Sequence, residues 1–128
     1  MVENQQEKSD IILSSFVLHH LSWEQKYFVV SKLPHLLKTG GIFILIDIFR
    51  SENENRENYI KRYLEGVRQD WSELTSQEYS LVEEHISKND FPETQEAFHS
   101  LATKHGFTKV ESLYCDALDT TKLLCFYQ

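Results

Sequence analysis

Residues 10–50 constrain the fold more than any other part of the chain, because two apolar runs enclose an amphipathic stretch. The runs are residues 11–13 and 42–46. Neither run alternates with polar residues, as strands do when one sheet face is wet. We therefore expect two parallel strands joined by a right-handed crossover, with helices covering both faces of the sheet. An aspartate in place of Ile44 would then be buried without a partner and would remove most of the stability of a small domain.

The stretch between the two runs carries start and stop signals for a helix. Ser22 and Gln25 form the pattern of a capping box, which satisfies two backbone N–H groups at the start of a helix. We expect Pro34 to open a final turn, and Gly40 or Gly41 to end the helix in a left-handed conformation. Apolar residues at steps of three and four predict a stripe against the sheet, made of Trp23, Tyr27, Val30, Leu33 and Leu37.

The middle of the chain predicts two further helices. Thr75 and Glu78 form a second capping-box pattern, so one helix should end before Thr75 and another should begin after it. The second helix should stop near Asp90 and Pro92. The first has a wide aromatic face, made of Tyr59, Ile60, Tyr63, Leu64, Val67, Trp71 and Leu74.

The C-terminal part predicts a helix followed by a hairpin. The helix, over residues 93–105, would stop at Gly106. Residues 107–115 and 122–127 have the pattern of two strands with a short connection. Cys115 and Cys125 fall in these strands, and we expect reduced thiols rather than a disulfide.

Composition allows one domain and argues against some partners. A chain of 128 residues with 41% hydrophobic content can bury one core, so we expect a flexible lead-in over residues 1–9 and a single domain over residues 10–128. The net charge of −7 arises in residues 51–100, which hold 12 acidic and 5 basic residues. That region would repel nucleic-acid phosphates and anionic membranes, so we expect no direct binding to either. The polar start of the chain and the absence of a long apolar run predict a cytoplasmic protein.

Two stretches carry a resemblance to a known family: Asp10-Ile-Ile-Leu-Ser-Ser-Phe-Val-Leu-His-His-Leu, and Leu36-Leu-Lys-Thr-Gly-Gly-Ile-Phe-Ile-Leu-Ile-Asp. They are similar to the fourth strand, its helix and the fifth strand of class I S-adenosylmethionine-dependent methyltransferases, of the small-molecule and tRNA-modifying type. Thr39 stands where family members usually have proline. Gly106-Phe107 and the hairpin after it also fit the family. The resemblance therefore places the chain on the C-terminal half of the family's fold.

The resemblance implies a partial Rossmann-like α/β fold of about four strands, two parallel and then a C-terminal antiparallel hairpin, with four helices. The implied sheet order is fourth, fifth, seventh and sixth strand. Residues 11–15 would then form a bare edge whose backbone groups lack partners. We expect a second copy to pair there about a two-fold axis, through residues 11–16 or the neighbouring aromatic helix, or an N-terminal methyltransferase half to cover the edge.

The resemblance also implies S-adenosylmethionine as the cofactor, although two of the family's cofactor-binding features are missing. The family holds it with a glycine-rich turn after the first strand and an acidic residue at the end of the second. The glycines of this chain are Gly40, Gly41, Gly66 and Gly106, so no G-x-G loop can be written. We therefore expect that this chain alone does not bind the cofactor.

The site residues that the resemblance implies lie just after the fourth strand. Ser14, Ser15 and Phe16 would touch the methionine part of the cofactor. His20 would lie near the transferred methyl group as the catalytic base, because imidazole is the side chain whose unperturbed pKa lies nearest neutrality. The alternative interpretation is an ordinary strand-to-helix loop, and both stay open.

His19 and Asp47 are the candidate substrate contacts. His19 and His20 are adjacent, so we expect their side chains to diverge, and no acidic residue or cysteine has a ligand spacing to them, so we expect no metal site. Asp47 lies near the end of an apolar strand, where ligands bind in open α/β sheets. It is either a site residue or an acid that reaches solvent at the rim.

Three functions remain as hypotheses. The first is a methyltransferase whose N-terminal half comes from another chain or has been lost. The second is a non-catalytic, homodimeric interaction module that keeps the fold. The third is an unrelated enzyme, and it has the least support because G-x-S-x-G, H-E-x-x-H and C-x-x-C motifs are all absent.

Overall fold

The computed structural model describes residues 7–70 and 73–128. Most of the predicted lead-in, and Trp71 of the predicted aromatic face, lie outside these residues. The elements in chain order are β1 (Ser9–Ser15), the short 3₁₀ helix η2 (Leu18–His20), α1 (Trp23–Leu36), β2 (Leu37–Arg50), α2 (Arg56–Asp70), α3 (Ser76–Asn89), β3 (Glu93–Thr94), α4 (Gln95–Lys104), β4 (Lys109–Cys115) and β5 (Thr121–Tyr127).

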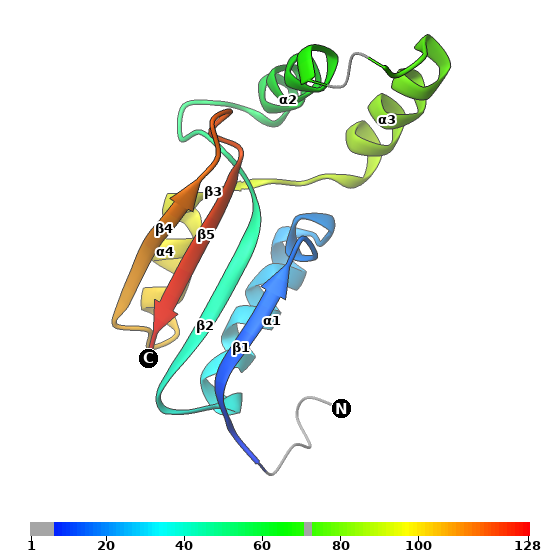
Figure 1. The fold of residues 1–128 in the computed structure, drawn as a ribbon. Helices are drawn as coiled ribbons and strands as arrows, with labels where there is room; N and C mark the ends of the chain where they lie inside the picture. Colours follow the sequence, from blue (N-terminus) through cyan, green and yellow to red (C-terminus); the bar gives the residue numbers. More distant parts are fainter. Residues whose placement is uncertain (1–6, 71–72) are drawn as a thin grey trace.

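The sheet has the strand order that the resemblance implies. Its order is β1-β2-β5-β4, with β1 parallel to β2 and with β5 antiparallel to both β2 and β4 (Figure 1). The two-residue strand β3, which the sequence did not predict, pairs with the end of β2. The partial Rossmann-like α/β fold with four α-helices in the described residues is confirmed.

Helix starts follow the capping signals. Ser22 accepts a hydrogen bond from the N–H of Gln25 at 3.2 Å, and the Gln25 side chain accepts one from the N–H of Ser22 at 3.0 Å. Thr75 and Glu78 form the same reciprocal pair at the start of α3. Helix α4 begins two residues later than predicted, because Thr94 is its N-cap and accepts from the N–H of Ala97.

The predicted end of α1 is wrong. The helix stops at Leu36, and Leu37 is already extended and almost fully buried as the first residue of β2. Pro34 cannot donate to the preceding turn, which weakens the helix at this point. Gly40 does take a left-handed φ of 78°, but it does so within β2, next to the register shift opposite Ser9 and Ile11.

The main core lies on one face of the sheet. Helices α1 and α4 both lie on that face, behind the sheet in Figure 1. Alternate residues of β2 point into this core: Phe43 and Leu45 are almost fully buried, and they pair with Phe126 and Leu124 of β5. The core also takes in Val30, Leu33, Phe98, Leu101 and Phe107.

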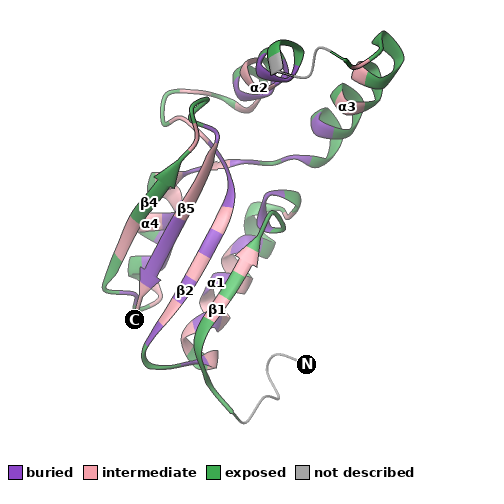
Figure 2. Cartoon of the chain, in the orientation of Figure 1, coloured by how far each residue is buried: buried purple, intermediate pink, exposed green. Residues whose placement is uncertain are grey.

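The opposite face of the sheet is open, so the prediction that helices cover both faces is wrong. Ile11 and Leu13 of β1 are 57% and 60% exposed, and Ile44 between them and β5 is partly exposed (Figure 2). Aspartate at Ile44 would therefore not be fully buried in this chain. The apolar run in β2 misled the prediction because its outward residues are apolar although no described helix covers most of them.

Helices α2 and α3 do not close the open face. They lie beyond the end of the sheet in Figure 1 and form a second cluster with Ile48, near the end of β2. Tyr59, Ile60, Leu64 and Ile86 are its other buried members. The predicted aromatic stripe thus belongs to a small helix–helix core. Cys115 is exposed and Cys125 is buried, and neither takes part in a disulfide.

Candidate functional site

The candidate site begins where β1 ends beside Ile46 of the parallel strand β2, near the carboxyl end of the sheet, where open α/β sheets bind ligands. Phe16 follows β1 with a φ of 55°, and its N–H donates to the carbonyl of Ile46 at 2.8 Å. A non-glycine residue in this region costs on the order of 1–3 kcal/mol, and such residues cluster in tight turns and at functional sites. The strained turn directs the chain into η2, which carries both histidines.

Asp47 and His19 form a buried hydrogen-bonded pair. His19 Nδ1 lies 2.6 Å from Asp47 Oδ1, and the His19 N–H donates to Asp47 Oδ2 at 3.2 Å. The N–H of Ile48 also donates to Asp47 Oδ1, at 2.8 Å. Asp47 is 2% exposed, so the alternative of an acid at the solvent rim is wrong. Because an ionised carboxylate only accepts, Nδ1 of His19 donates to Asp47, and Nε2 is the ring nitrogen that Asp47 leaves unused.

His20 lies beside His19 rather than diverging from it. The ring centroids are 3.9 Å apart with a tilt of 44°, so the predicted divergence is wrong. Both residues contact the end of α3 and the segment after it: His20 Nδ1 lies 3.1 Å from the carbonyl oxygen of Asn89, and the backbone N–H of Phe91 donates to the backbone carbonyl of His19 at 2.7 Å. The His20 side chain is 41% exposed, whereas that of His19 is 9% exposed.

Asp90 is the residue of this cluster that sequence reasoning missed. Its Oδ1 lies 3.7 Å from His19 Nε2 and 3.6 Å from His20 Nδ1. Asp90 is 7% exposed, and its Oδ1 accepts no hydrogen bond from any described residue. Burial raises the pKa of the Asp90 carboxyl above its usual range, although the neighbouring imidazoles oppose this shift. In the sequence, Asp90 carries only the signal of a helix end, because about seventy residues separate it from the histidines.

A buried lysine of α1 holds the segment that follows α3, residues 90–93. Lys26 is 1% exposed, and its Nζ donates to Glu93 Oε2 at 2.9 Å and to the carbonyl of Phe91. Burial lowers the pKa of Lys26, while the hydrogen bond to Glu93 opposes this shift. Arg56 fixes the residues after α3 from α2, since its Nε donates to the carbonyl of Asp90 at 2.7 Å.

The predicted stripe of α1 is only partly right. Val30 and Leu33 are buried, but Trp23 is 41% exposed, and the charged residue Lys26 takes an inward position.

The predicted cofactor contacts lie beside this cluster but do not share one face. Ser14 pairs with Leu45 and so lies on the helix-covered face, where it is partly exposed. Ser15 and Phe16 are exposed, and Phe16 is 47% exposed. The structure thus brings His19, His20 and Asp47 together and leaves Ser15 and Phe16 accessible next to them.

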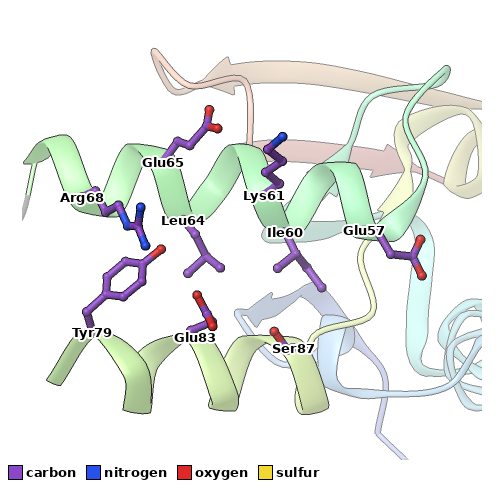
Figure 3. A pocket seen from close by; sticks show the side chains of 9 residues that line it. All are labelled: Glu57, Ile60, Lys61, Leu64, Glu65, Arg68, Tyr79, Glu83 and Ser87. Atoms are coloured by element: carbon purple, nitrogen blue, oxygen red, sulfur yellow. The ribbon is translucent and has the colours of Figure 1, made fainter. Parts of the chain in front are cut away.

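A hollow lies between α2 and α3, away from the histidine cluster (Figure 3). Its volume is about 370 Å³. The side chains of Ile60 and Leu64 point from α2 towards α3, and the guanidinium of Arg68 lies 4.4 Å from the ring centroid of Tyr79. Its acidic and basic side chains are mixed, and none of the histidine cluster lines it. The hollow therefore indicates no particular ligand.

No helix in the described part of the chain is long and apolar enough to cross a bilayer.

Burial of the Asp90 carboxylate, whose Oδ1 accepts no hydrogen bond from the described residues, predicts a gain in stability on neutralisation. A carboxyl whose pKa is raised on folding binds its proton more tightly in the folded chain, so it lowers stability as the pH rises from the unfolded pKa through the folded one. Asp90→Asn should therefore raise the free energy of unfolding at pH 7 by on the order of 1 kcal/mol, measured by urea unfolding. The gain should shrink as the pH falls towards about 4.

Asp116→Asn is the matched control for this prediction. The Asp116 carboxylate accepts from the N–H and hydroxyl of Thr120 at 2.7 and 2.9 Å and from the N–H of Thr121 at 3.0 Å. The same substitution there should lower stability, because it removes acceptors from paired donors. An Asp90→Asn variant no more stable than the parent at pH 7 would show that Asp90 has a partner that the geometry does not reveal.

No protein-family model and no curated protein matches the chain. Solved structures do match. An O-methyltransferase family protein from Burkholderia thailandensis aligns with 100% of this chain at a TM-score of 0.66 and 12% identity. Human N-acetylserotonin methyltransferase, solved with S-adenosylmethionine, aligns with 99% at 0.66 and 13% identity, and the S-adenosylmethionine-dependent methyltransferase SibL aligns with 100% at 0.63 and 13% identity.

This chain spans 33%, 31% and 34% of those three chains, about a third of their length. Identities this low show a shared fold and not a shared activity. The chain therefore has the fold of one part of an S-adenosylmethionine-dependent methyltransferase, consistent with the C-terminal half that its sequence predicts.

Proposed function

We propose that this chain is the C-terminal half of an S-adenosylmethionine-dependent methyltransferase that acts on a small molecule or a tRNA, and that it binds the cofactor only when an N-terminal half completes the pocket. The observation that carries the proposal is the open sheet face, together with the free edge of β1. Both are surfaces that a folded protein normally covers.

The open face is a continuous apolar surface. Cross-strand register places three rows of residues on it, because directly paired residues share a face. The rows pair Ile11 with Ile42, Leu13 with Ile44, and Ile46 with Leu123 of β5. Removing such surface from water contributes about 25 cal/mol per Å². Helices of an N-terminal half could lie on this face while one of its strands pairs with β1.

The proposed N-terminal half would also supply the glycine-rich turn that holds the cofactor. No glycine-rich turn is present in the sequence. Bound S-adenosylmethionine would supply an electrophilic methyl group. This chain would contribute the turn at Ser15 and Phe16 as one wall, as the resemblance to the family implies.

His20 is the residue we assign to proton transfer. Its side chain is the more exposed of the two histidines, while His19 is held by Asp47 beneath it. As general base, His20 would accept a proton from the acceptor group as the methyl group is transferred, a role that contributes about 10²–10⁴-fold to rate. Asp47 would act through His19 by fixing the position of that ring.

Calorimetric titration with S-adenosylhomocysteine tests the cofactor part of the proposal. The chain alone should give no saturable heat, because the glycine turn and the ribose-binding acid are absent. Addition of a polypeptide that carries a glycine-rich strand–turn–helix half should produce saturable binding. Saturable micromolar binding by this chain alone, or none after the second half has formed a stable complex, would contradict the proposal.

A non-catalytic homodimeric module is the second candidate, and the same β1 edge favours it. Two copies could pair their β1 strands antiparallel about a two-fold axis and so satisfy both edges. Light scattering would then give twice the chain mass of 15.1 kDa at micromolar concentration.

Leu13 and Leu113 offer a matched test of the dimer. They are 60% and 59% exposed and lie on the opposite edge strands β1 and β4. Leu13→Lys should dissociate the dimer, whereas Leu113→Lys should not, because only the former places a charge beside the predicted contact. A 15.1 kDa species in the unmodified protein would rule out this candidate.

A further inference from the structure

We propose that His19, His20 and Asp90 form a binding site for a divalent transition metal ion of the zinc class, with Asp47 as the residue that orients His19. The proposal does not depend on the methyltransferase assignment, because it rests only on the geometry of these four side chains. It replaces the sequence-based expectation that no metal site is present.

The three side chains have the spacing that a small divalent cation needs. One ligand atom from each can be chosen so that all lie within 4.8 Å of one another. The measured separations from Asp90 Oδ1 are 3.7 Å to His19 Nε2 and 3.6 Å to His20 Nδ1. Bonds of about 2.0–2.1 Å in a tetrahedral zinc site place neighbouring ligand atoms about 3.3 Å apart, so the two distances from Asp90 need to shorten by only a few tenths of an ångström. The two imidazole nitrogens, which lie within 4.8 Å of each other, would have to approach by at most about 1.5 Å.

Asp47 prepares His19 to bind a metal. Its carboxylate accepts from Nδ1 at 2.6 Å, which leaves Nε2, 3.7 Å from Asp90 Oδ1, as the ring nitrogen that can bind a metal. A carboxylate that accepts from the second nitrogen of a metal-bound histidine fixes the tautomer and raises the basicity of the ligand. The second hydrogen bond, from the His19 N–H to Asp47 Oδ2, fixes the backbone as well.

The buried carboxylate of Asp90 points to a bound cation independently of the ligand spacing. Its Oδ1 is buried and accepts no hydrogen bond from the described residues, yet it faces the ring nitrogens of both histidines. A buried carboxylate oxygen without a donor is expensive, and coordination of a cation would offset that cost. Neither imidazole is placed to satisfy this oxygen by a hydrogen bond, since both nitrogen–oxygen distances exceed 3.5 Å.

His20 leaves the site open on one side. Its side chain is 41% exposed, which gives an ion a path to the two buried ligands. Binding through His20 Nδ1 would replace its hydrogen bond to the Asn89 carbonyl. Three protein ligands with a fourth position open to water or substrate are typical of catalytic zinc sites, and two imidazoles with one carboxylate suit zinc and other first-row divalent ions. With a cation bound, the ion would take over the activation of an acceptor group that we assign to His20 in the metal-free chain.

Titration of the chain with zinc chloride against a competing chromophoric chelator tests the proposal. We expect one zinc ion per chain with a micromolar or lower dissociation constant. Asp47→Asn should weaken binding about 10–100-fold, the range for the loss of an outer-sphere partner. Asp90→Asn and His20→Gln should weaken it further. Loss of binding in Asp90→Asn cannot be attributed to unfolding if urea unfolding shows the variant folded.

His35→Gln is the matched control. His35 is an exposed histidine near the end of α1, outside the cluster, and its loss should leave zinc affinity unchanged. Cobalt(II) provides a second readout: the parent chain should show visible ligand-field bands that His20→Gln alters and His35→Gln does not. The proposal is overturned by the absence of stoichiometric zinc binding, by equal weakening in His35→Gln, or by undiminished affinity in Asp90→Asn.

Discussion

The different environments of the two faces of β2 underlie the rest of this structure. Strand β2 hydrogen-bonds to β1 and β5 along its length, so its alternate side chains fall on two separate surfaces. One row, Phe43 and Leu45, is sealed by α1 and α4, while Ile44 in the other row remains partly exposed. The chain therefore has a main core on one face of the sheet, a smaller core where α2 and α3 meet Ile48, and an apolar surface around Ile44 that no described helix covers. Both candidate functions follow from this surface. An N-terminal half would cover the open face, and a second copy of the chain would pair with the β1 edge beside it.

The sealed row also determines the chemistry at the end of the sheet. Asp47 follows Phe43 and Leu45 at steps of two, so the alternation that buries those residues buries its carboxylate as well. The carboxylate is tolerated because three donors reach it, from the backbone and ring of His19 and from the backbone of Ile48. Asp90, which is also buried, has no such donor at Oδ1. The Asp47 carboxylate thus stabilises the turn, while Oδ1 of Asp90 receives no hydrogen bond from it.

Local signals predicted the local structure, and non-local contacts could not be predicted from them. Capping boxes at Ser22 and Thr75 gave helix starts to the residue, because the pattern and the hydrogen bonds involve the same few positions. The end of α1 was missed because the burial of Leu37 in the sheet overrides the glycine signal that follows it. The position of Asp90 depends on α2 and α3 returning the chain to η2, and no short pattern records that path. Of the candidate site, His19, His20 and Asp47 could be named from sequence, but the geometry that joins them could not.

Carbene footprinting read out by mass spectrometry tests most directly whether one face of the sheet is bare. At a concentration where light scattering gives a monomer, Ile11 and Leu13 should be labelled strongly while Leu45 and Leu124 stay protected. These residues are of similar size, and they differ because Leu13 is 60% exposed whereas Leu45 and Leu124 are fully buried. Protection of Ile11 and Leu13 equal to that of Leu45 in the monomer would contradict the account, because it would mean that the chain itself covers both faces of its sheet.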